Sequence, residues 1–251
     1  MRIELRNVTK NYGPVAALRG ISLSLASGSK IALVGPNGSG KSTLIRALLG
    51  MVRTGGEILV GGRDAYHDRN LLGSQLAYVP QSPPQFSSTV GELVKAVRLI
   101  RDLRHGEIER CAERLNLDLK AVAGKPVKEL SGGMKQKLSL TLALAPRARL
   151  LVLDEPTASL DPESQGRFYE MLRERMREAT LILSSHRLDE VRELVNSVVV
   201  LENGQVRSQS TLYEFLGERQ AELPACQARE SFLHVPEPNS GQLALTRAFQ
   251  E

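Results

Sequence analysis

The chain has 251 residues, of which 41% are hydrophobic, 24% are charged and 4% are aromatic, and its formal net charge is +5. This length and composition are typical of a globular protein with one or two domains, and no apolar run approaches the roughly 18 residues of a membrane span. Basic residues are interleaved with acidic ones and few aromatics accompany them, so we expect no nucleic-acid partner. The N-terminus lacks a signal-peptide core, so we expect a cytosolic chain unless a partner holds it at a membrane.

Two segments near the N-terminus alternate apolar and polar residues as half-buried strands do, namely Ile3–Val8 and Ile21–Leu25. Between them, the predicted turn at Asn11–Pro14 leaves Tyr12 exposed. Tyr12 is either a packing residue or, in a nucleotide-binding protein, a platform on which a purine ring stacks.

A glycine-rich stretch follows the apolar run Ile31–Val34 and precedes a predicted helix at residues 44–49. This order of strand, turn and helix is the context of a phosphate-binding loop, in which backbone N–H groups and a helix N-terminus converge on the anion. Lys41 supplies a mobile charge for the outer phosphates, and Ser42 supplies a hydroxyl for Mg²⁺. The loop therefore predicts that the chain binds a nucleoside triphosphate. It comprises Gly35, Pro36, Asn37, Gly38, Ser39, Gly40, Lys41, Ser42 and Thr43.

The segment after this loop changes from strands to helices. Glu57–Val60 and Leu76–Val79 are predicted short strands, and a proline-rich stretch then ends that pattern. From about residue 90 to residue 119, apolar residues recur at helical spacing. We therefore predict a helical insert, with Ser88 or Thr89 as its N-cap.

A second loop with the composition of an anion site lies at Leu130–Gly133, where a hydroxyl and two glycines precede a predicted helix that ends at Leu144. It is either a plain N-cap or a second phosphate site. One nucleotide needs only one phosphate cradle, so two such sites in one chain suggest that two chains share each nucleotide.

The continuous apolar segment Leu150–Leu153 is typical of a strand buried in a parallel sheet, and two acidic residues follow it. Such strand ends are where α/β proteins bind ligands. We expect Asp154 to hold Mg²⁺ through water, opposite Ser42, and Glu155 to orient or deprotonate an attacking water. A solvent-facing strand end is the alternative for the acidic pair taken alone.

The remaining elements complete an α/β pattern. We predict a helix over Asp161–Met176, buried strands at Leu181–Leu183 and Ser197–Leu201, and a hairpin turn at Asn203–Gly204. The alternation of strands with helices favours a parallel sheet with helices packed on it.

From residue 217 onward the regular pattern ends, which predicts a short tail over residues 217–251, with one terminal helix near Leu243. Cys226 and His234 lie in this tail without a third candidate ligand, so we expect no metal there.

These motifs occur in the order found in ABC-family ATPase subunits, which the chain resembles from residue 1 to residue 216. The resemblance implies an α/β fold: a P-loop NTPase core with a mixed, largely parallel sheet and flanking helices, an N-terminal antiparallel β subdomain, and an α-helical subdomain inserted at about residues 82–128. The counterparts of the family motifs are Tyr12 (A-loop), Gly35–Thr43 (Walker A), Gln81 (Q-loop), Ser131, Gly132 and Gly133 (signature motif), Asp154 and Glu155 (Walker B), Ser159–Asp161 (D-loop) and His186 (switch histidine).

The resemblance also implies what these residues do. Tyr12 would stack on adenine, Gln81 would sense Mg²⁺ and the attacking water, and His186 would contact the γ-phosphate. Residues 131–133 would bind the γ-phosphate held by the opposite subunit, and the loop ending in Asp161 would cross the dimer interface. Taken alone, His186 would more often be a structural histidine.

The implied function is that of an ATP-binding subunit that hydrolyses ATP in a head-to-tail dimer, with a homodimer having two competent sites. ATP and Mg²⁺ are the implied cofactors. Hydrolysis would drive a substrate through integral membrane permease subunits, which choose the substrate and hold the chain at the cytoplasmic face of the inner membrane.

Two other functions are open to this pattern. A non-transport ABC ATPase acting on DNA or ribosomes usually has a long coiled-coil insertion, a second cassette or zinc modules, which this sequence lacks. A nucleotide-regulated interaction module without turnover is disfavoured because Glu155 and His186 are both present.

Two motifs favour export. Ser131–Gln136 and Ser184–Val191 resemble an exporter-like branch whose membrane subunits are encoded separately. That branch includes drug, lipid and polysaccharide exporters and, as a specific candidate, the transporter for copper-site maturation of nitrous oxide reductase. Importers more often have Gln where this chain has Met134, and Lys137 stands where Arg is more common.

Overall fold

The computed structural model of the chain describes residues 1–84, 86–177 and 179–222. The chain divides into two compact units, Met1–Leu212 and Tyr213–Glu251. All strands of the described residues belong to the first unit, whereas helix α9 (Leu212–Glu222) lies almost entirely in the second.

The predicted limit of the ATPase domain, at residue 216, thus falls inside a helix. The helix predicted near Leu243, and Cys226 and His234, lie outside the described residues.

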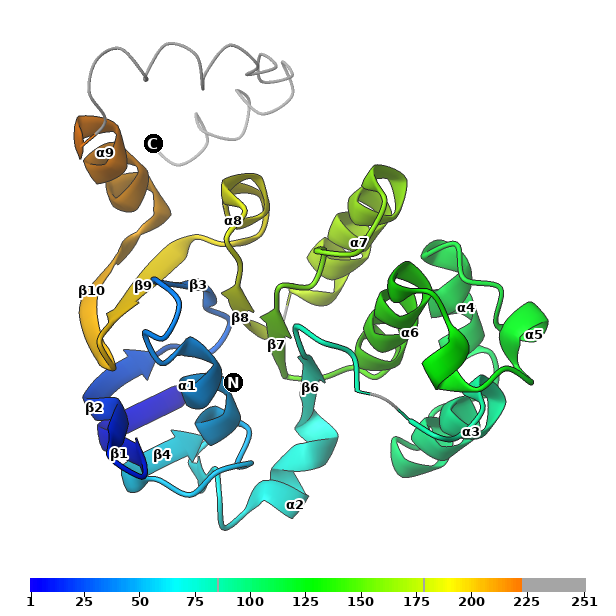
Figure 1. Ribbon diagram of the computed structural model, residues 1–251, viewed down its shortest axis with the longest axis horizontal. Helices are drawn as coiled ribbons and strands as arrows, with labels where there is room; N and C mark the ends of the chain where they lie inside the picture. The colour runs from blue at the N-terminus through cyan, green and yellow to red at the C-terminus, as the bar shows by residue number, and fades with distance from the viewer. Residues whose placement is uncertain (85, 178, 223–251) are drawn as a thin grey trace, which may run out of the picture. The chain divides into compact units, whose positions relative to one another are not determined.

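A six-stranded sheet forms the centre of the first unit, with strand order β10-β9-β3-β8-β7-β6 (Figure 1). Neighbouring strands from β9 to β6 run parallel, and β10 pairs antiparallel with β9 at the edge. This confirms the predicted mixed, largely parallel sheet. Its strands are β3 (Lys30–Val34), β6 (Leu76–Val79), β7 (Leu150–Asp154), β8 (Thr180–Ser184), β9 (Ser197–Glu202) and β10 (Gln205–Thr211).

The interior strands β7 and β8 are buried at every residue, as expected from their apolar sequences. Because β3, β8 and β7 are parallel neighbours, their carboxyl ends meet at the same edge of the sheet. The segments that follow these three strands carry the glycine-rich loop, the pair Asp154–Glu155 and His186. The strand order therefore brings the predicted site residues together.

A four-stranded antiparallel sheet, in the order β2-β1-β4-β5, precedes and follows the glycine-rich loop in sequence. The strands predicted at Ile3–Val8 and Ile21–Leu25 are present as β1 and β2, but both are longer than predicted. Shifts in register along the β1–β2 pair interrupt the alternation of apolar and polar residues while the pairing itself continues. The strands are β1 (Ile3–Tyr12), β2 (Val15–Leu25), β4 (Gly55–Val60) and β5 (Arg63–Asp64).

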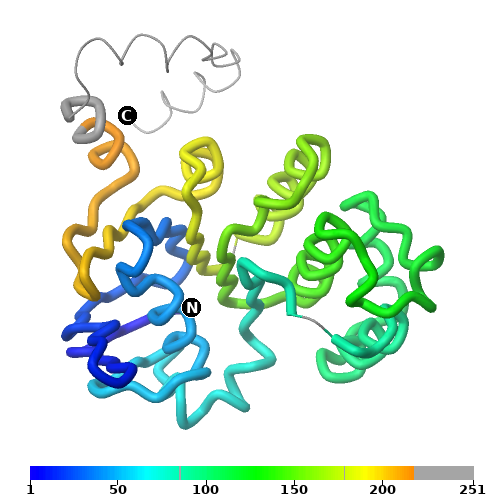
Figure 2. The backbone as a smooth tube through the Cα atoms, viewed as in Figure 1, coloured from blue at the N-terminus to red at the C-terminus, as the bar shows by residue number. Residues whose placement is uncertain are grey.

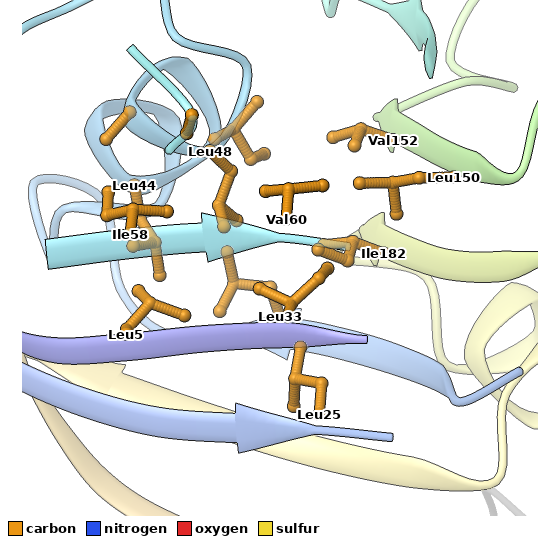
Figure 3. Packing of buried hydrophobic residues seen from close by; sticks show 14 of the residues in the cluster. Leu5, Leu25, Leu33, Leu44, Leu48, Ile58, Val60, Leu150, Val152 and Ile182 are labelled. Atoms are coloured by element: carbon orange, nitrogen blue, oxygen red, sulfur yellow. The ribbon is translucent and has the colours of Figure 1, made fainter. Parts of the chain in front are cut away.

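Apolar side chains from both sheets and from helix α1 (Lys41–Leu48) form one core (Figure 3). Representative members, each at most 4% exposed, are Leu5 and Ile58 from the antiparallel sheet, Leu33 and Ile182 from the parallel sheet, and Leu44 from α1. Burying one such side chain contributes about 1.5–3 kcal/mol. The core thus holds α1, and with it the end of the glycine-rich loop, against both sheets.

The chain leaves the parallel sheet after β6, forms a group of helices beside β6 and β7, and returns at β7 (Figures 1 and 2). The helical periodicity expected from residue 90 to residue 119 is interrupted after Ile100, because Asp102 and Gly106 adopt left-handed backbone conformations with φ of 48° and 86°. The helices of this group are α3 (Val90–Ile100), α4 (Glu107–Arg114), α5 (Leu119–Val122) and α6 (Gly132–Leu144).

Thr89 is the N-cap of α3, as one of the two predicted candidates. Its hydroxyl accepts a hydrogen bond from the backbone N–H of Glu92 (3.3 Å), and its own N–H donates to the Glu92 carboxylate (2.8 Å). This reciprocal capping box fixes the first turn of the helical group.

Further helices lie outside this group, and none in the described residues is long and apolar enough to cross a membrane. The predicted turn between β9 and β10 is present, with left-handed φ values of 50° at Asn203 and 77° at Gly204, as a tight hairpin requires. The remaining helices are α2 (Arg69–Leu72), α7 (Pro162–Arg175) and α8 (Leu188–Leu194).

Candidate nucleotide-binding and catalytic site

The glycine-rich loop joins the carboxyl end of β3 to the N-terminus of α1, and two of its glycines are required by close contacts. A Cβ atom on Gly35 would lie 2.1 Å from the carbonyl oxygen of Leu201, and one on Gly40 would lie 2.6 Å from that of Ala17. Both residues also have positive φ, 150° and 102°. The loop is therefore packed between β9 and β2 in a form that only glycine permits.

Hydrogen bonds hold the middle of the loop. The Ser39 N–H donates to the Pro36 carbonyl (3.2 Å), and the Ser39 carbonyl accepts from the Gly204 N–H in the β9–β10 turn (3.0 Å). The Ser39 hydroxyl is enclosed and has no hydrogen-bond partner among the described residues. The loop is thus fixed at Ser39 by the β9–β10 turn.

Lys41 lies folded over the loop, where its Nζ donates to the carbonyl oxygens of Gly35 (2.7 Å) and Pro36 (3.0 Å). Burial lowers the pKa of Lys41, and the nearby carboxylates of Asp154 and Glu155 act in the opposite direction. The two carbonyls are weak partners for an ammonium group compared with a phosphate, so a bound polyphosphate would redirect this side chain.

Asp154 is the last residue of β7 and is buried, and Glu155 follows it in a left-handed conformation with φ of 48°. Every other described non-glycine residue with positive φ is Asn or Asp. A larger side chain costs roughly 1–2 kcal/mol in this region. The Glu155 N–H donates to the Ser184 carbonyl (2.8 Å), which holds this unusual turn at the sheet edge.

The carboxylate of Glu155 faces His186, with 3.5 Å between Glu155 Oε1 and His186 Nε2. The imidazole is 58% exposed, whereas the carboxylate is only 12% exposed. Burial raises the pKa of Glu155, and the charge of a protonated His186 would lower it. A carboxylate with a raised pKa at the rim of a cavity is suited to accept a proton from water.

A cavity of about 330 Å³ lies where these segments meet, which is within the size range of small-molecule sites. Gly35, Pro36 and Ser39 support the loop without lining this cavity. The predicted residues that line it are Asn37, Gly38, Gly40, Lys41, Ser42, Thr43, Gln81, Asp154, Glu155 and His186.

Sequence reasoning missed four residues of this lining: Val15, Ala16, Ala17 and Ser184. The first three lie on β2, which reaches the glycine-rich loop through the close approach of Ala17 to Gly40. In the sequence these three residues are only a short apolar run at the start of a strand. Their place in the cavity lining follows from the tertiary fold and could not be predicted from that run.

The oxygen donors along the cavity fit a magnesium ion. Ser42 offers a hydroxyl, Asp154 a carboxylate and Gln81 an amide oxygen, and all three line the same cavity. Mg²⁺ prefers such hard oxygen ligands together with water and substrate phosphates.

Tyr12 does not line the cavity. Its ring is 44% exposed, and the Lys10 ammonium lies 5.1 Å from the ring centroid. The prediction that Tyr12 is exposed is confirmed, but Asn11 and Tyr12 end strand β1 and only Gly13 and Pro14 form the turn, because pairing with β2 continues to Tyr12.

Residues 131–133 also lie outside the cavity. The Ser131 hydroxyl caps α6 by accepting a hydrogen bond from the Met134 N–H (3.3 Å). Ser131 and Gly132 are exposed, and outside the adjoining residues and the backbone of α6 no heavy atom of the described part of the chain lies within 4 Å of the place where a Cβ on Gly132 would stand. The N-cap role is therefore real, but it does not account for Gly132.

Asp161 is the N-cap of α7, and its carboxylate accepts hydrogen bonds from the N–H and hydroxyl of Ser164, both at 2.8 Å. Lys137 Nζ lies 3.1 Å from the same carboxylate. The Ser164 bonds, followed by Lys137, hold the pKa of Asp161 well below its usual range. Lys137 thus ties α6 to the loop that carries Asp161.

Comparison with known proteins gives a consistent result. The family model described as "ABC transporter" matches residues 18–158. Nod factor export ATP-binding protein I of Rhizobium sp. (strain N33) is 35% identical over 241 residues, which cover 92% of this chain and 76% of that protein. Energy-coupling factor transporter ATP-binding protein EcfA of Methanothermobacter thermautotrophicus is 34% identical over 244 residues, covering 93% and 76%.

A solved structure titled "Structure of ATP binding subunit of ABC transporter" superimposes with a TM-score of 0.78 at 27% identity, covering 90% of this chain and 95% of that one. The chain spans only part of some other relatives: 66% of the Nod factor export protein of Rhizobium meliloti and 8% of the glucosylceramide transporter ABCA12 of Mus musculus.

Proposed function

Because the chain belongs to the ABC transporter family and is one of its ATP-binding, ATP-hydrolysing domains, we propose that it drives a substrate through integral membrane subunits that are separate chains. One observation carries the proposal: a phosphate loop, two strand-end acids and His186 share one cavity, while the second loop at residues 131–133 lies open outside it.

Within one subunit, the backbone N–H groups of residues 35–43 and the Lys41 ammonium would hold the phosphates of ATP. Tyr12 would stack on the adenine. Ser42, Gln81 and Asp154 would hold Mg²⁺, which when bound neutralises charge on the outer phosphates. The geometry supports this division, because the metal ligands and Lys41 line one cavity and the aromatic face lies apart from it.

Hydrolysis would use Glu155 and His186. Glu155 would orient the attacking water and take its proton, and the raised pKa of its carboxyl group favours that transfer at neutral pH. His186 would donate from Nε2 toward the γ-phosphate. Gln81, which lines the same cavity, would sense the attacking water.

Two subunits would assemble head to tail, so that Ser131, Gly132 and Gly133 of one subunit bind the γ-phosphate on the other. A helix N-terminus with exposed N–H groups suits that anion. The loop ending in Asp161 would cross the interface. A homodimer would have two complete sites, since each chain carries both halves.

Export is the direction we propose. The segments Ser131–Gln136 and Ser184–Val191 resemble the exporter-like branch, and Nod factor export proteins are among the relatives at 35% identity. Phosphate import proteins are also relatives, at 31% identity. The proposal of export therefore rests on the two sequence motifs rather than on the relatives. The transporter for copper-site maturation of nitrous oxide reductase is our specific candidate.

The helices α3 to α6 would transmit closure of the dimer to the membrane subunits through Gln81, which would place the chain at the cytoplasmic face of the inner membrane. None of these helices exceeds 13 residues. That length does not fit the long coiled-coil insertions of ABC ATPases that act on DNA.

The deciding experiment is affinity purification of the full chain from its native cells, from membrane and soluble fractions, using Glu155→Gln to retain the ATP-bound dimer and Lys41→Ala as the matched variant without it. We expect integral membrane subunits to copurify from the membrane fraction. Recovery with DNA or ribosomes alone would overturn the transporter function.

A further inference from the structure

A cluster of enclosed polar groups lies beside the segment that carries His186. Its centre is Glu190 of α8, whose side chain is fully buried. One carboxyl oxygen of Glu190 accepts a hydrogen bond from the Ser185 hydroxyl (2.5 Å), whose oxygen in turn accepts from the Arg187 N–H (3.1 Å). The residues on both sides of His186 are therefore held by one hydroxyl, and that hydroxyl is held by one carboxyl group.

The second carboxyl oxygen of Glu190 has no hydrogen-bond partner among the described residues. The same is true of the Thr157 hydroxyl and of the Tyr169 hydroxyl on α7, although all three atoms are enclosed. Burial raises the pKa of both Glu190 and Tyr169, and the nearby Thr157 hydroxyl acts against burial in both. The three groups are thus neighbours without a bond of normal geometry.

Native proteins leave few enclosed polar groups unpaired, because each lost hydrogen bond costs free energy. Thr157 follows Glu155 by two residues, so the enclosed polar groups include one from the loop after the catalytic acid.

A purely structural role does not account for Glu190. An apolar side chain would fill the same buried position without the cost of burying a carboxyl group. The Arg187 guanidinium is paired at the surface with Asp189 (2.7 Å).

We propose that Glu190 is a positioning residue for His186, because through Ser185 it fixes the segment 185–187. The inference rests on the proposed role of His186 in hydrolysis.

The test uses Ser185→Ala and Glu190→Gln in the full chain. Each variant is expected to lower kcat about tenfold, as loss of a group that orients a reacting one does, with KM for ATP unchanged. The double variant should fall no further than Ser185→Ala alone, because Glu190 acts on the segment through the Ser185 hydroxyl. Ser197→Ala is the matched control, since its hydroxyl donates to the Ser210 carbonyl (3.0 Å) far from the site, and it should retain wild-type kcat.

Two further measurements separate positioning from stability. The chain has four histidines, so the NMR signals of labelled histidine can be assigned with His186→Ala, and Glu190→Gln should move the His186 signals alone. In a His186→Ala background, Ser185→Ala should cause no further loss of the residual rate.

Wild-type kcat in Ser185→Ala and Glu190→Gln, or an equal loss in the His186→Ala background, would overturn this inference and leave the proposed function intact. A wild-type rate in His186→Ala itself would overturn the proposed role of His186 and this inference with it, whereas the transport function is tested separately by copurification.

Discussion

The loop Gly35–Thr43 and the loop Ser131–Gly133 both combine glycines, a hydroxyl and a helix N-terminus, and they differ in their surroundings. The first is pressed against the carbonyls of Leu201 and Ala17 and borders a cavity with two carboxylates. The second is exposed, and a Cβ atom on Gly132 would have open space among the described residues. The glycines of the first loop are explained by this chain, whereas Gly132 is not.

The comparison shows that two loops of similar composition can supply different parts of a phosphate-binding site. A loop with its own cavity, acids and lysine can hold a phosphate alone. A helix N-terminus without such support needs its ligand brought by another molecule. This contrast makes the following predictions specific to one loop or the other.

The largest expected effect is on the acid that faces the first loop. Glu155→Gln should lower kcat about 10²- to 10⁴-fold, as loss of a general base does, while ATP affinity is retained because Lys41 and the loop are intact. Steady-state hydrolysis and gel filtration with ATP would show loss of turnover together with accumulation of dimer. Turnover at the wild-type rate would show that another group takes the proton.

Gly132→Asp should separate the two loops most clearly. Among the described residues the Cβ of the new side chain would have open space, and its carboxylate would lie in the first turn of α6, where negative charge is favourable. We therefore expect an unchanged or raised thermal midpoint and normal ATP binding, with kcat about 10²- to 10³-fold lower because the partner's γ-phosphate loses its donors and meets a like charge. Normal turnover would mean that this loop is only an N-cap.

Lys41→Ala removes the mobile charge of the first loop. Hydrogen bonds to charged groups contribute about 1.5–3 kcal/mol, so ATP should bind about 10- to 150-fold more weakly, as measured by titration with a fluorescent ATP analogue. The thermal midpoint without nucleotide should change little, because Lys41 Nζ contacts only two loop carbonyls.

Mixing the Gly132→Asp and Lys41→Ala variants tests whether two subunits share each ATP site. A dimer of Gly132→Asp with Lys41→Ala has one intact phosphate loop opposite one intact signature loop. An equal mixture should recover about a quarter of the wild-type rate, since half of randomly formed dimers are mixed and each has one intact site. Absence of any recovery would contradict the head-to-tail arrangement.

The smallest effect concerns pH. Burial raises the pKa of Glu155, so acidification protonates this base at a higher pH than an ordinary glutamate with a pKa of about 4.3. The acid limb of kcat should therefore have its midpoint above that value in wild type and disappear from the residual rate of Glu155→Gln. A limb at the ordinary value would contradict the raised pKa.

The sequence alone predicted those strands and helices whose capping residues and apolar patterns match their burial in the structure. The strand Leu76–Val79 has the predicted bounds, and the helices capped by Thr89, Ser131 and Asp161 begin where expected, because a capping side chain and the following pattern act within one turn. The phosphate loop could also be predicted from the sequence, because its strand, glycines and helix are adjacent in the chain.

What sequence could not show depends on contacts between distant segments. Val15, Ala16 and Ala17 line the cavity only because β2 packs against the loop. Asp189 and Glu190 are adjacent acids, yet the first pairs with Arg187 at the surface and the second is fully buried. No local pattern distinguishes them, because the turn after His186 decides which side chain faces inward.

The order of strands in the parallel sheet has a consequence for how this protein is made. The strand that carries the phosphate loop, β3, pairs with β8 and β9, both of which come from the last third of the first unit. The N–H of Gly204, which clamps Ser39, comes later still. A ribosome therefore completes the phosphate loop early but leaves its strand without a neighbour until β8 emerges. A nascent chain that ends before Gly204 contains the phosphate loop but lacks the hydrogen bond from Gly204 to Ser39. ATP binding can therefore stabilise the folded unit only when its synthesis is nearly finished.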